Sequence, residues 1–361
     1  METKDRTKRL PLWAVVVLDA LALGAALVVF ALFHHVLPQT MEPAGLRSVS
    51  ATPLPTAAPA RTPEPSPEAA EAPQTPEEPE RAEEPDGRSP WAIRFEEHFT
   101  DAVTVTENSY SSPNVSVEIR QMDMQNGEHK NVCYVADIYI ADIRCLRSYL
   151  AHDTYGRGIV QDILGMAQDS GAIAAITGDM YAYQGASLML RNGELYRDGR
   201  WQPYQTHCVL FYDGTMAVYG PEEIDYEQAM ADGAWQIWSF GPILVRGGEM
   251  GNDFSSGMAV ESENPRTALG YFEPGHYCFA VVDGRRPGYS YGMTFEELAQ
   301  VMLDLGCECA YNLDGGGSTA MAFNGALANI PSGGGRELSD IILVAEPPAE
   351  EAAAEESGAE E

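Results

Sequence analysis

Most of the chain alternates short apolar runs with polar stretches, and the spacing of the apolar positions predicts both strands and helices. Apolar residues at every second position predict a strand over 115–122. Helical spacing that ends in a glycine predicts a helix over 158–171. A second helix is predicted over 293–307, where Thr294 and Glu297 have the spacing of a capping box. Further strands are predicted at 131–143, 172–177, 266–273, 277–284 and 309–314, and an Asp-Gly turn predicts a hairpin over 207–220.

These elements follow one another without a strict alternation of strand and helix. A doubly wound parallel sheet requires that alternation, so the order of elements favours an α+β arrangement. We therefore predict a single α+β domain over 91–345, with a mixed sheet and flanking helices.

The N-terminal pattern predicts a membrane segment. An apolar run over 12–33, interrupted only by Asp19, is long enough to cross a hydrocarbon core as a helix. The preceding segment, 1–11, is basic, which favours a cytoplasmic N-terminus. We therefore predict a transmembrane signal anchor over 12–37, in a single-pass protein of the cell membrane whose C-terminal domain is extracytoplasmic. A cleaved signal peptide is the alternative that the sequence leaves open.

Two segments have a composition that cannot form a core. Residues 38–90 and 346–361 are acidic, rich in Ala or Pro and poor in large apolar side chains, so we predict a disordered linker and a disordered tail. They contribute to a formal net charge of −32. A chain this acidic repels phosphate backbones, which argues against nucleic acid as a partner.

The six cysteines lack the Cys-x-x-Cys spacing of a zinc site, and the histidines are scattered. We therefore predict no zinc site. An extracytoplasmic location permits disulfides, but buried free thiols fit the sequence equally well.

Several predicted strands end in an acidic residue beside glycine. Asp314 is followed by three glycines in "YNLDGGGSTAM" (311–321), and Asp179 and Asp283 stand next to Gly178 and Gly284. Such a pair marks many ordinary turns. A glycine-rich turn can also present bare amides to an anion. Together with an arginine at another strand entry, Arg266, these positions predict a polar cleft.

The motifs resemble, in order, those of the phosphodiester glycosidases. The resemblance covers about 170–345 well and rests on "PRT" (265–267), "DGR" (283–285) with "GMT" (292–294), "NLDGGGS" (312–318), and "NIPS" (329–332) followed by Arg336. At one position the chain departs from the family pattern, because Thr177 stands where many members have asparagine.

The resemblance implies hydrolysis of a sugar-1-phosphodiester between the anomeric carbon and oxygen. That reaction passes through an oxocarbenium-like state and usually employs two carboxyl groups. The departing phosphomonoester has a conjugate acid with a pKa of about 6, so its developing charge needs stabilisation more than protonation. Arginine can provide that stabilisation through paired hydrogen bonds.

Roles follow from the resemblance as hypotheses. Asp314 is the first candidate for nucleophile or base, and Asp179 and Asp283 are candidates for the second carboxylate or for binding sugar hydroxyls. Arg266 is the first choice for the phosphate. The remaining substrate-binding candidates are Arg285, Arg336, Gly178, Gly315, Gly316, Gly317, Ser318, Thr319 and Asn329.

The sequence thus predicts a membrane-anchored extracytoplasmic hydrolase that needs no cofactor and acts on phosphorylated glycans of the cell envelope or of exopolysaccharide. Two alternatives stay open. Asp179, Asp283 and Asp314 could instead hold a divalent cation in a metal-dependent phosphodiesterase. The domain could also be a non-catalytic envelope protein that binds glycan.

Overall fold

The structure, a computed structural model, describes residues 12–31, 37–41, 43, 89–126, 129–184, 187–198, 205–255 and 261–348. The predicted basic segment 1–11 lies outside these residues, as do most of the predicted linker 38–90 and nearly all of the predicted tail 346–361. Within the linker, β1 (Gln39–Thr40) pairs with β7 (Gly156–Arg157) of the folded domain.

Helix α1 (Leu12–Ala31) occupies the predicted anchor segment. None of the helices in the described ranges combines the length and the apolar character that a membrane crossing requires. The membrane anchor stays a prediction.

The largest sheet has nine strands in the order β15-β14-β18-β16-β17-β5-β4-β3-β2, and each neighbouring pair is antiparallel. Its strands are β2 (Thr104–Val105), β3 (Ser109–Ser111), β4 (Val115–Asn126), β5 (His129–Ile140), β14 (Ile243–Arg246), β15 (Glu249–Met250), β16 (Arg266–Glu273), β17 (His276–Val282) and β18 (Cys309–Asn312). Every strand that the sequence predicted in this sheet is present.

Two five-stranded sheets complete the domain, and their strand pairs are also antiparallel. One contains β6 (Leu146–Leu150), β8 (Ala174–Thr177), β19 (Met321–Phe323), β20 (Ala326–Leu327) and β21 (Asp340–Val344). The other contains β9 (Leu188–Arg191), β10 (Glu194–Asp198), β11 (His207–Phe211), β12 (Met216–Tyr219) and β13 (Ala234–Trp238). The predicted hairpin is β11–β12, and Gly214 takes a φ of 80° in its turn.

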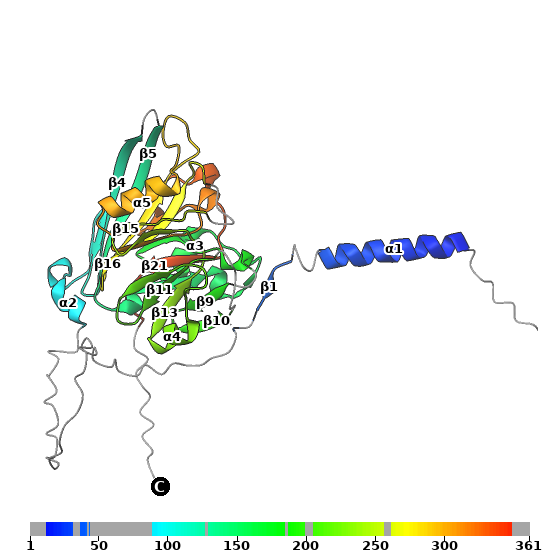
Figure 1. The fold of residues 1–361 in the computed structure, drawn as a ribbon, viewed down its shortest axis with the longest axis horizontal. Helices are drawn as coiled ribbons and strands as arrows, with labels where there is room; N and C mark the ends of the chain where they lie inside the picture. Colours follow the sequence, from blue (N-terminus) through cyan, green and yellow to red (C-terminus); the bar gives the residue numbers. More distant parts are fainter. Residues whose placement is uncertain are drawn as a thin grey trace, which may run out of the picture.

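Few helices accompany the sheets. They are α2 (Pro90–Arg94), α3 (Ile163–Ser170), α4 (Tyr226–Ala231) and α5 (Phe295–Asp304), with short 3-10 turns at 96–98, 143–145, 151–153, 181–183, 316–318 and 332–334. Helix α5 lies across one face of the large sheet (Figure 1). It begins with the predicted capping box, because Thr294 and Glu297 exchange side-chain and backbone hydrogen bonds. The predicted α+β domain is confirmed, because the domain is rich in sheet and has few helices.

The main hydrophobic core joins the three sheets. It contains Phe279 and Tyr311 of the large sheet, Ile176 and Ile342 of one smaller sheet, and Trp238 of the other. This packing brings the ends of β8, β17 and β18, where the acidic residues stand, into one region of the domain. All six cysteines are buried free thiols, so the structure contains no disulfide between them.

Candidate active site

A cavity of about 270 Å³ opens at the ends of β8 and β18. Its lining combines carboxylates, one arginine, hydroxyls and apolar side chains. The lining residues are Thr177, Met180, Tyr183, Asp314, Ser318, Arg336, Glu337, Leu338, Ser339 and Asp340. Of the site residues predicted from the sequence, Asp314, Ser318 and Arg336 line this cavity.

Asp314 is the predicted carboxylate that reaches this cavity. It follows β18, and its backbone N–H donates to the carbonyl of Gly178 at 3.1 Å, which joins the ends of β8 and β18. Burial raises the pKa of the Asp314 carboxyl, while Ser318 and Arg336 oppose that shift by favouring the charged form. A partly desolvated carboxylate beside a cation is suited to act as a base or nucleophile.

The glycines after Asp314 do not offer a row of bare amides. The N–H of Gly316 donates to the carbonyl of Pro265 at 2.8 Å. The N–H groups of Ser318 and Thr319 donate back to the carbonyls of Gly315 and Gly316, at 3.1 Å and 3.4 Å. The amides of Gly316, Ser318 and Thr319 are therefore engaged within the chain and do not add to the predicted anion nest.

The glycines instead make room for two guanidinium groups. A Cβ placed on Gly317 would lie 2.8 Å from Nη2 of Arg336, and one on Gly316 would lie 3.0 Å from Nη2 of Arg285. Gly316 also has a φ of 63°, which other residues rarely adopt. Two arginines therefore lie against adjacent residues of the glycine turn, next to Asp314.

Both of these arginines are exposed on the domain surface. The side chain of Arg285 is oriented by Asn264, whose Oδ1 accepts from Nε at 3.1 Å and from Nη2 at 2.9 Å. Arg285 also has a φ of 57°, an uncommon conformation for a residue with a side chain. Arg336 lines the cavity itself. Either guanidinium can therefore meet an anionic group that enters from solvent.

Arg266, the first choice for the phosphate, is placed differently from the prediction. It is only 5% exposed, and it donates through Nε to the carbonyl of Met293 and through Nη2 to that of Ser262, both at 2.8 Å. Its guanidinium lies 3.8 Å from the centre of the Phe295 ring. Burial, aided by the charge of Arg285, lowers its pKa to about 10. Arg266 therefore ties β16 to the start of α5, and its phosphate-binding role stays a prediction.

Asp283 and Asn329 hold two loops together. Asp283 Oδ1 accepts from Nδ2 of Asn329 at 2.8 Å, and Oδ2 accepts from the Tyr289 hydroxyl at 2.8 Å and from the Ile330 N–H at 3.1 Å. The Oδ1 of Asn329 accepts from the N–H of Met321 at 2.8 Å. Asp283 is only 1% exposed and does not line the cavity. Both side chains are engaged within the protein, and their contact with substrate stays a prediction.

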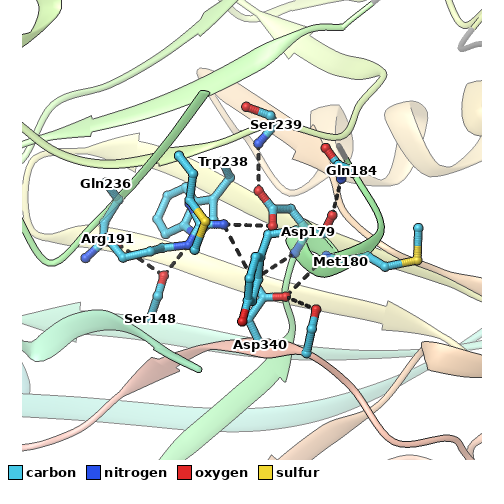
Figure 2. A network of polar contacts seen from close by, with 12 residues as sticks. Ser148, Asp179, Met180, Gln184, Arg191, Gln236, Trp238, Ser239 and Asp340 are labelled. Atoms are coloured by element: carbon cyan, nitrogen blue, oxygen red, sulfur yellow. Dashed lines mark hydrogen bonds and ion pairs between the residues drawn. The ribbon is translucent and has the colours of Figure 1, made fainter. Parts of the chain in front are cut away.

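Asp179 is also committed to an internal network, which Figure 2 shows. Its Oδ1 lies 2.7 Å from Nη2 of Arg191, and its Oδ2 accepts from the N–H of Ser239 at 2.8 Å. The same Arg191 nitrogen lies 3.5 Å from Oδ2 of Asp340. All three charged side chains are 1% exposed. Asp179 thus belongs to a buried Asp179–Arg191–Asp340 cluster, and it is not a second carboxylate open to substrate.

Gly178 lets this cluster approach the cavity. A Cβ at Gly178 would lie 2.2 Å from Oδ2 of Asp340, so only glycine fits there. Burial and the nearby charge of Asp179 raise the pKa of Asp340 to about 7. Sequence reasoning did not select Arg191 or Asp340, because neither stands beside glycine at the end of a predicted strand.

Thr177 has a defined place in the turn. Its hydroxyl donates to the carbonyl of Ser318 at 2.5 Å and accepts from the N–H of Ala320 at 3.3 Å. The hydroxyl therefore fixes the end of β8 to the glycine turn. Of the two predicted hydroxyl residues, Ser318 lines the cavity, whereas Thr319 is 1% exposed and lies outside its lining.

A second cavity, of about 380 Å³, lies beside α4 and contains none of the predicted site residues. Its lining residues are Leu188, Asp198, His207, Glu222, Glu223, Ile224, Asp225, Tyr226 and Glu227. The described part of the chain contains no group of three or more His, Cys, Asp or Glu side chains arranged to hold a metal ion.

Comparison with known proteins agrees with this architecture. Residues 170–345 match the family described as phosphodiester glycosidase. The chain is 31% identical over 193 residues to the SPbeta prophage-derived uncharacterized protein YomE of Bacillus subtilis (strain 168), a match that covers 52% of this chain and 30% of that relative. The chain thus spans less than a third of that relative's length.

A solved structure shares this fold. The catalytic domain of zebrafish N-acetylglucosamine-1-phosphodiester alpha-N-acetylglucosaminidase, auto-inhibited by its pro-peptide, matches with a TM-score of 0.52 at 20% identity, covering 68% of this chain and 88% of that one. A hypothetical protein from Synechocystis matches with a TM-score of 0.45 at 15% identity, covering 68% of this chain and 64% of that one.

The fold is thus a sheet-rich α+β domain like that of the zebrafish catalytic domain. Residues 170–345, just under half of the chain, match the phosphodiester glycosidase family, and the resemblance drawn from the sequence motifs is confirmed.

Proposed function

We propose that this domain hydrolyses a sugar-1-phosphodiester at the bond between the anomeric carbon and oxygen. The observation that carries the proposal is the shared cavity of Asp314 and Arg336, formed at the glycine turn within a phosphodiester glycosidase domain. A carboxylate and a guanidinium in one small cavity are the two groups that this reaction needs.

The proposed roles follow from position. Asp314 takes a proton from a water that attacks the anomeric carbon, or attacks that carbon itself to form an intermediate that water then hydrolyses. The anomeric C–O bond breaks, and the phosphomonoester leaves with the bonding electrons. Arg336 and Arg285 stabilise the charge that develops on the leaving phosphate, and the glycines allow both guanidiniums to lie close to the turn.

The substrate proposed is a phosphorylated glycan of the cell envelope or of exopolysaccharide. The zebrafish protein is named for N-acetylglucosamine 1-phosphodiesters, which supports an amino sugar as the first compound to test. We propose further that no cofactor takes part. Asp179 and Asp283 are engaged by Arg191 and by Asn329, so they do not join Asp314 in one ligand set for a cation.

The experiment is an assay of the full chain on the methyl phosphodiester of N-acetylglucosamine 1-phosphate, with and without a chelator. Release of free sugar in both conditions is the expected result. Turnover that disappears with the chelator and returns with added cation favours the metal-dependent phosphodiesterase instead. Binding without turnover, across a panel of sugar-1-phosphodiesters, favours a glycan-binding protein.

We also propose that the domain is extracytoplasmic and anchored by residues 12–37. The support is the basic segment 1–11 and the apolar run over 12–33. Mild protease on intact cells should then release a soluble fragment that begins within residues 40–90. A domain that resists the protease until the membrane is opened contradicts this topology.

A further inference from the structure

The cavity lining divides into two chemically different parts. Asp314 and Ser318 of the glycine turn, with Arg336, form a charged and polar part. Met180, Tyr183 and Leu338 form an apolar part. Tyr183 is 63% exposed, so its ring is accessible to a ligand that enters the cavity.

The backbone before Tyr183 is held in an uncommon conformation. Met180 has a φ of 58°, and its N–H donates to Oδ1 of Asp340 at 3.2 Å. The carbonyl of Met180 accepts from the N–H of Tyr183 at 3.1 Å, which closes the 3-10 turn Tyr181–Tyr183. Tyr181 is 1% exposed and anchors the turn in a small hydrophobic cluster. The turn is therefore fixed from its buried side.

The backbone after Tyr183 is held in place as well. Figure 2 shows Gln184, the next residue, in contact with Asp179. The side-chain amide of Gln184 donates to the carbonyl of Asp179. The carbonyl of Gln184 accepts from Nη1 of Arg197, whose Nη2 donates to the Ser187 hydroxyl at 2.8 Å. Polar groups thus fix the chain on both sides of the exposed Tyr183 ring.

A buried ion cluster is a costly way to stabilise a fold. Removing Asp179, Arg191 and Asp340 from water carries a large desolvation penalty, which apolar packing would avoid. What the cluster does supply is a fixed geometry for the turn that carries Met180 and Tyr183. Pre-organised aromatic side chains bind ligands with little loss of conformational entropy.

We propose that Tyr183 determines the sugar specificity of this cavity by packing its ring against the apolar face of the substrate's sugar, while the phosphate lies toward Arg336. The inference rests on the proposed function and adds an orientation to it. Within the cluster, Asp179 and Arg191 lie outside the cavity lining and position the Tyr183 turn from its buried side.

Calorimetric titration of the full chain with two probes tests this orientation. N-acetylglucosamine 1-phosphate carries both the sugar and the phosphate, whereas inorganic phosphate carries only the second. Tyr183→Ala should weaken binding of the sugar phosphate roughly three- to tenfold, as expected for one aromatic contact, and leave phosphate binding unchanged. Tyr183→Phe keeps the ring and should bind both probes like the wild type. Arg336→Ala should weaken both.

Tyr226→Ala is the matched control, because Tyr226 lines the other cavity and should change neither titration. Since Tyr183 is exposed, its variants should keep the wild-type melting temperature. Equal binding of the sugar phosphate by Tyr183→Ala and the wild type overturns this inference and leaves the proposed hydrolysis standing. Failure of the wild type to bind the sugar phosphate at all overturns both.

Discussion

Two cavities in the described part of the domain differ in whether an arginine lines them. The larger, about 380 Å³, is lined by the acidic residues Asp198, Glu222, Glu223, Asp225 and Glu227. Burial lowers the pKa of His207 in that lining to about 4, so this histidine is neutral at pH 7 and does not offset the negative charge. The smaller, about 270 Å³, contains Arg336 and lies against the glycine turn.

The arginine, and not the volume, is the reason to propose the smaller cavity for a phosphodiester. The chain carries a formal net charge of −32, so the field of the whole protein repels an anionic substrate. A phosphate can be held only where local cations overcome that field. Arg285 and Arg336 supply them beside Asp314, whereas the larger cavity adds to the repulsion.

The largest expected effect is that of Asp314→Asn. The variant removes the carboxylate that acts on the anomeric carbon, so kcat should fall by about 10²- to 10⁴-fold. Because burial raises the pKa of this carboxyl, its ionised form costs stability at neutral pH, and the melting temperature of the variant should equal or exceed that of the wild type. Turnover close to the wild-type rate in a folded variant removes Asp314 from the mechanism.

Lysine substitutions at Arg336 and Arg266 should distinguish an arginine that binds substrate from one that stabilises the fold. Arg336→Lys keeps the charge but loses the planar pair of donors, so kcat/KM should fall by about tenfold or more with little change in melting temperature. Arg266→Lys should instead lower the free energy of unfolding by about 1–3 kcal/mol, since its buried guanidinium donates to the carbonyls of Met293 and Ser262. Thermal melts and steady-state kinetics measure both. The reverse pattern would restore Arg266 as the phosphate ligand.

Gly317→Ala should have a severalfold effect on kcat/KM. The added Cβ would lie 2.8 Å from Nη2 of Arg336 and displace this flexible, exposed side chain from the turn, so the activity changes more than the stability. Gly325→Ala is the control. Gly325 has a φ of 77° and no atom within 4 Å of an added Cβ, so the change should slightly lower stability and leave kcat/KM unchanged. Equal kinetics for Gly317→Ala and the wild type would show that Arg336 does not need this contact.

Asp340 should give the fold a pH dependence. Its pKa is raised to about 7, so the folded state holds this proton more tightly than the unfolded state does. The stabilisation is complete below the ordinary carboxyl pKa of about 4 and is lost as pH rises to about 7. The melting temperature of the wild type relative to Asp340→Asn should therefore decline over that interval and level off above it. A constant difference from pH 4 to pH 8 would contradict the raised pKa.

The smallest effect is expected in the acidic cavity. Glu222→Gln combined with Glu227→Gln reduces the repulsion of an anionic substrate only at long range, so kcat/KM should change by less than about twofold at physiological salt. A large loss of activity in this double variant would mean that the larger cavity takes part in catalysis.

Local patterns were enough to predict most of the fold. Apolar alternation located β4, and the Thr294–Glu297 pair located the start of α5. Asp314 could be placed at the end of β18 because three glycines follow it in the sequence. These features depend on residues that are close in sequence, and their periodicity is unambiguous.

The partners of the charged side chains could not be predicted in the same way. Six residues of β16, beginning with Arg266, are all buried, so alternation does not show which side of the strand meets solvent. The partner of Asp283 is Asn329, 46 residues away, and Arg191 meets Asp340 from another sheet. Such contacts are set by how the sheets pack. Sequence spacing therefore identified acidic strand ends without showing which of them open to the cavity.

The most direct test of the central claim is hydrolysis of a sugar-1-phosphodiester in heavy-oxygen water, with mass spectrometry of both products. Attack at the anomeric carbon, assisted by Asp314, places the label on the free sugar and leaves the phosphomonoester unlabelled. That result is predicted for the wild type, and the residual activity of Arg336→Lys should give the same distribution. Label on the phosphate and none on the sugar would show that the phosphorus–oxygen bond is broken, which contradicts the assignment of this cavity as a phosphodiester glycosidase site.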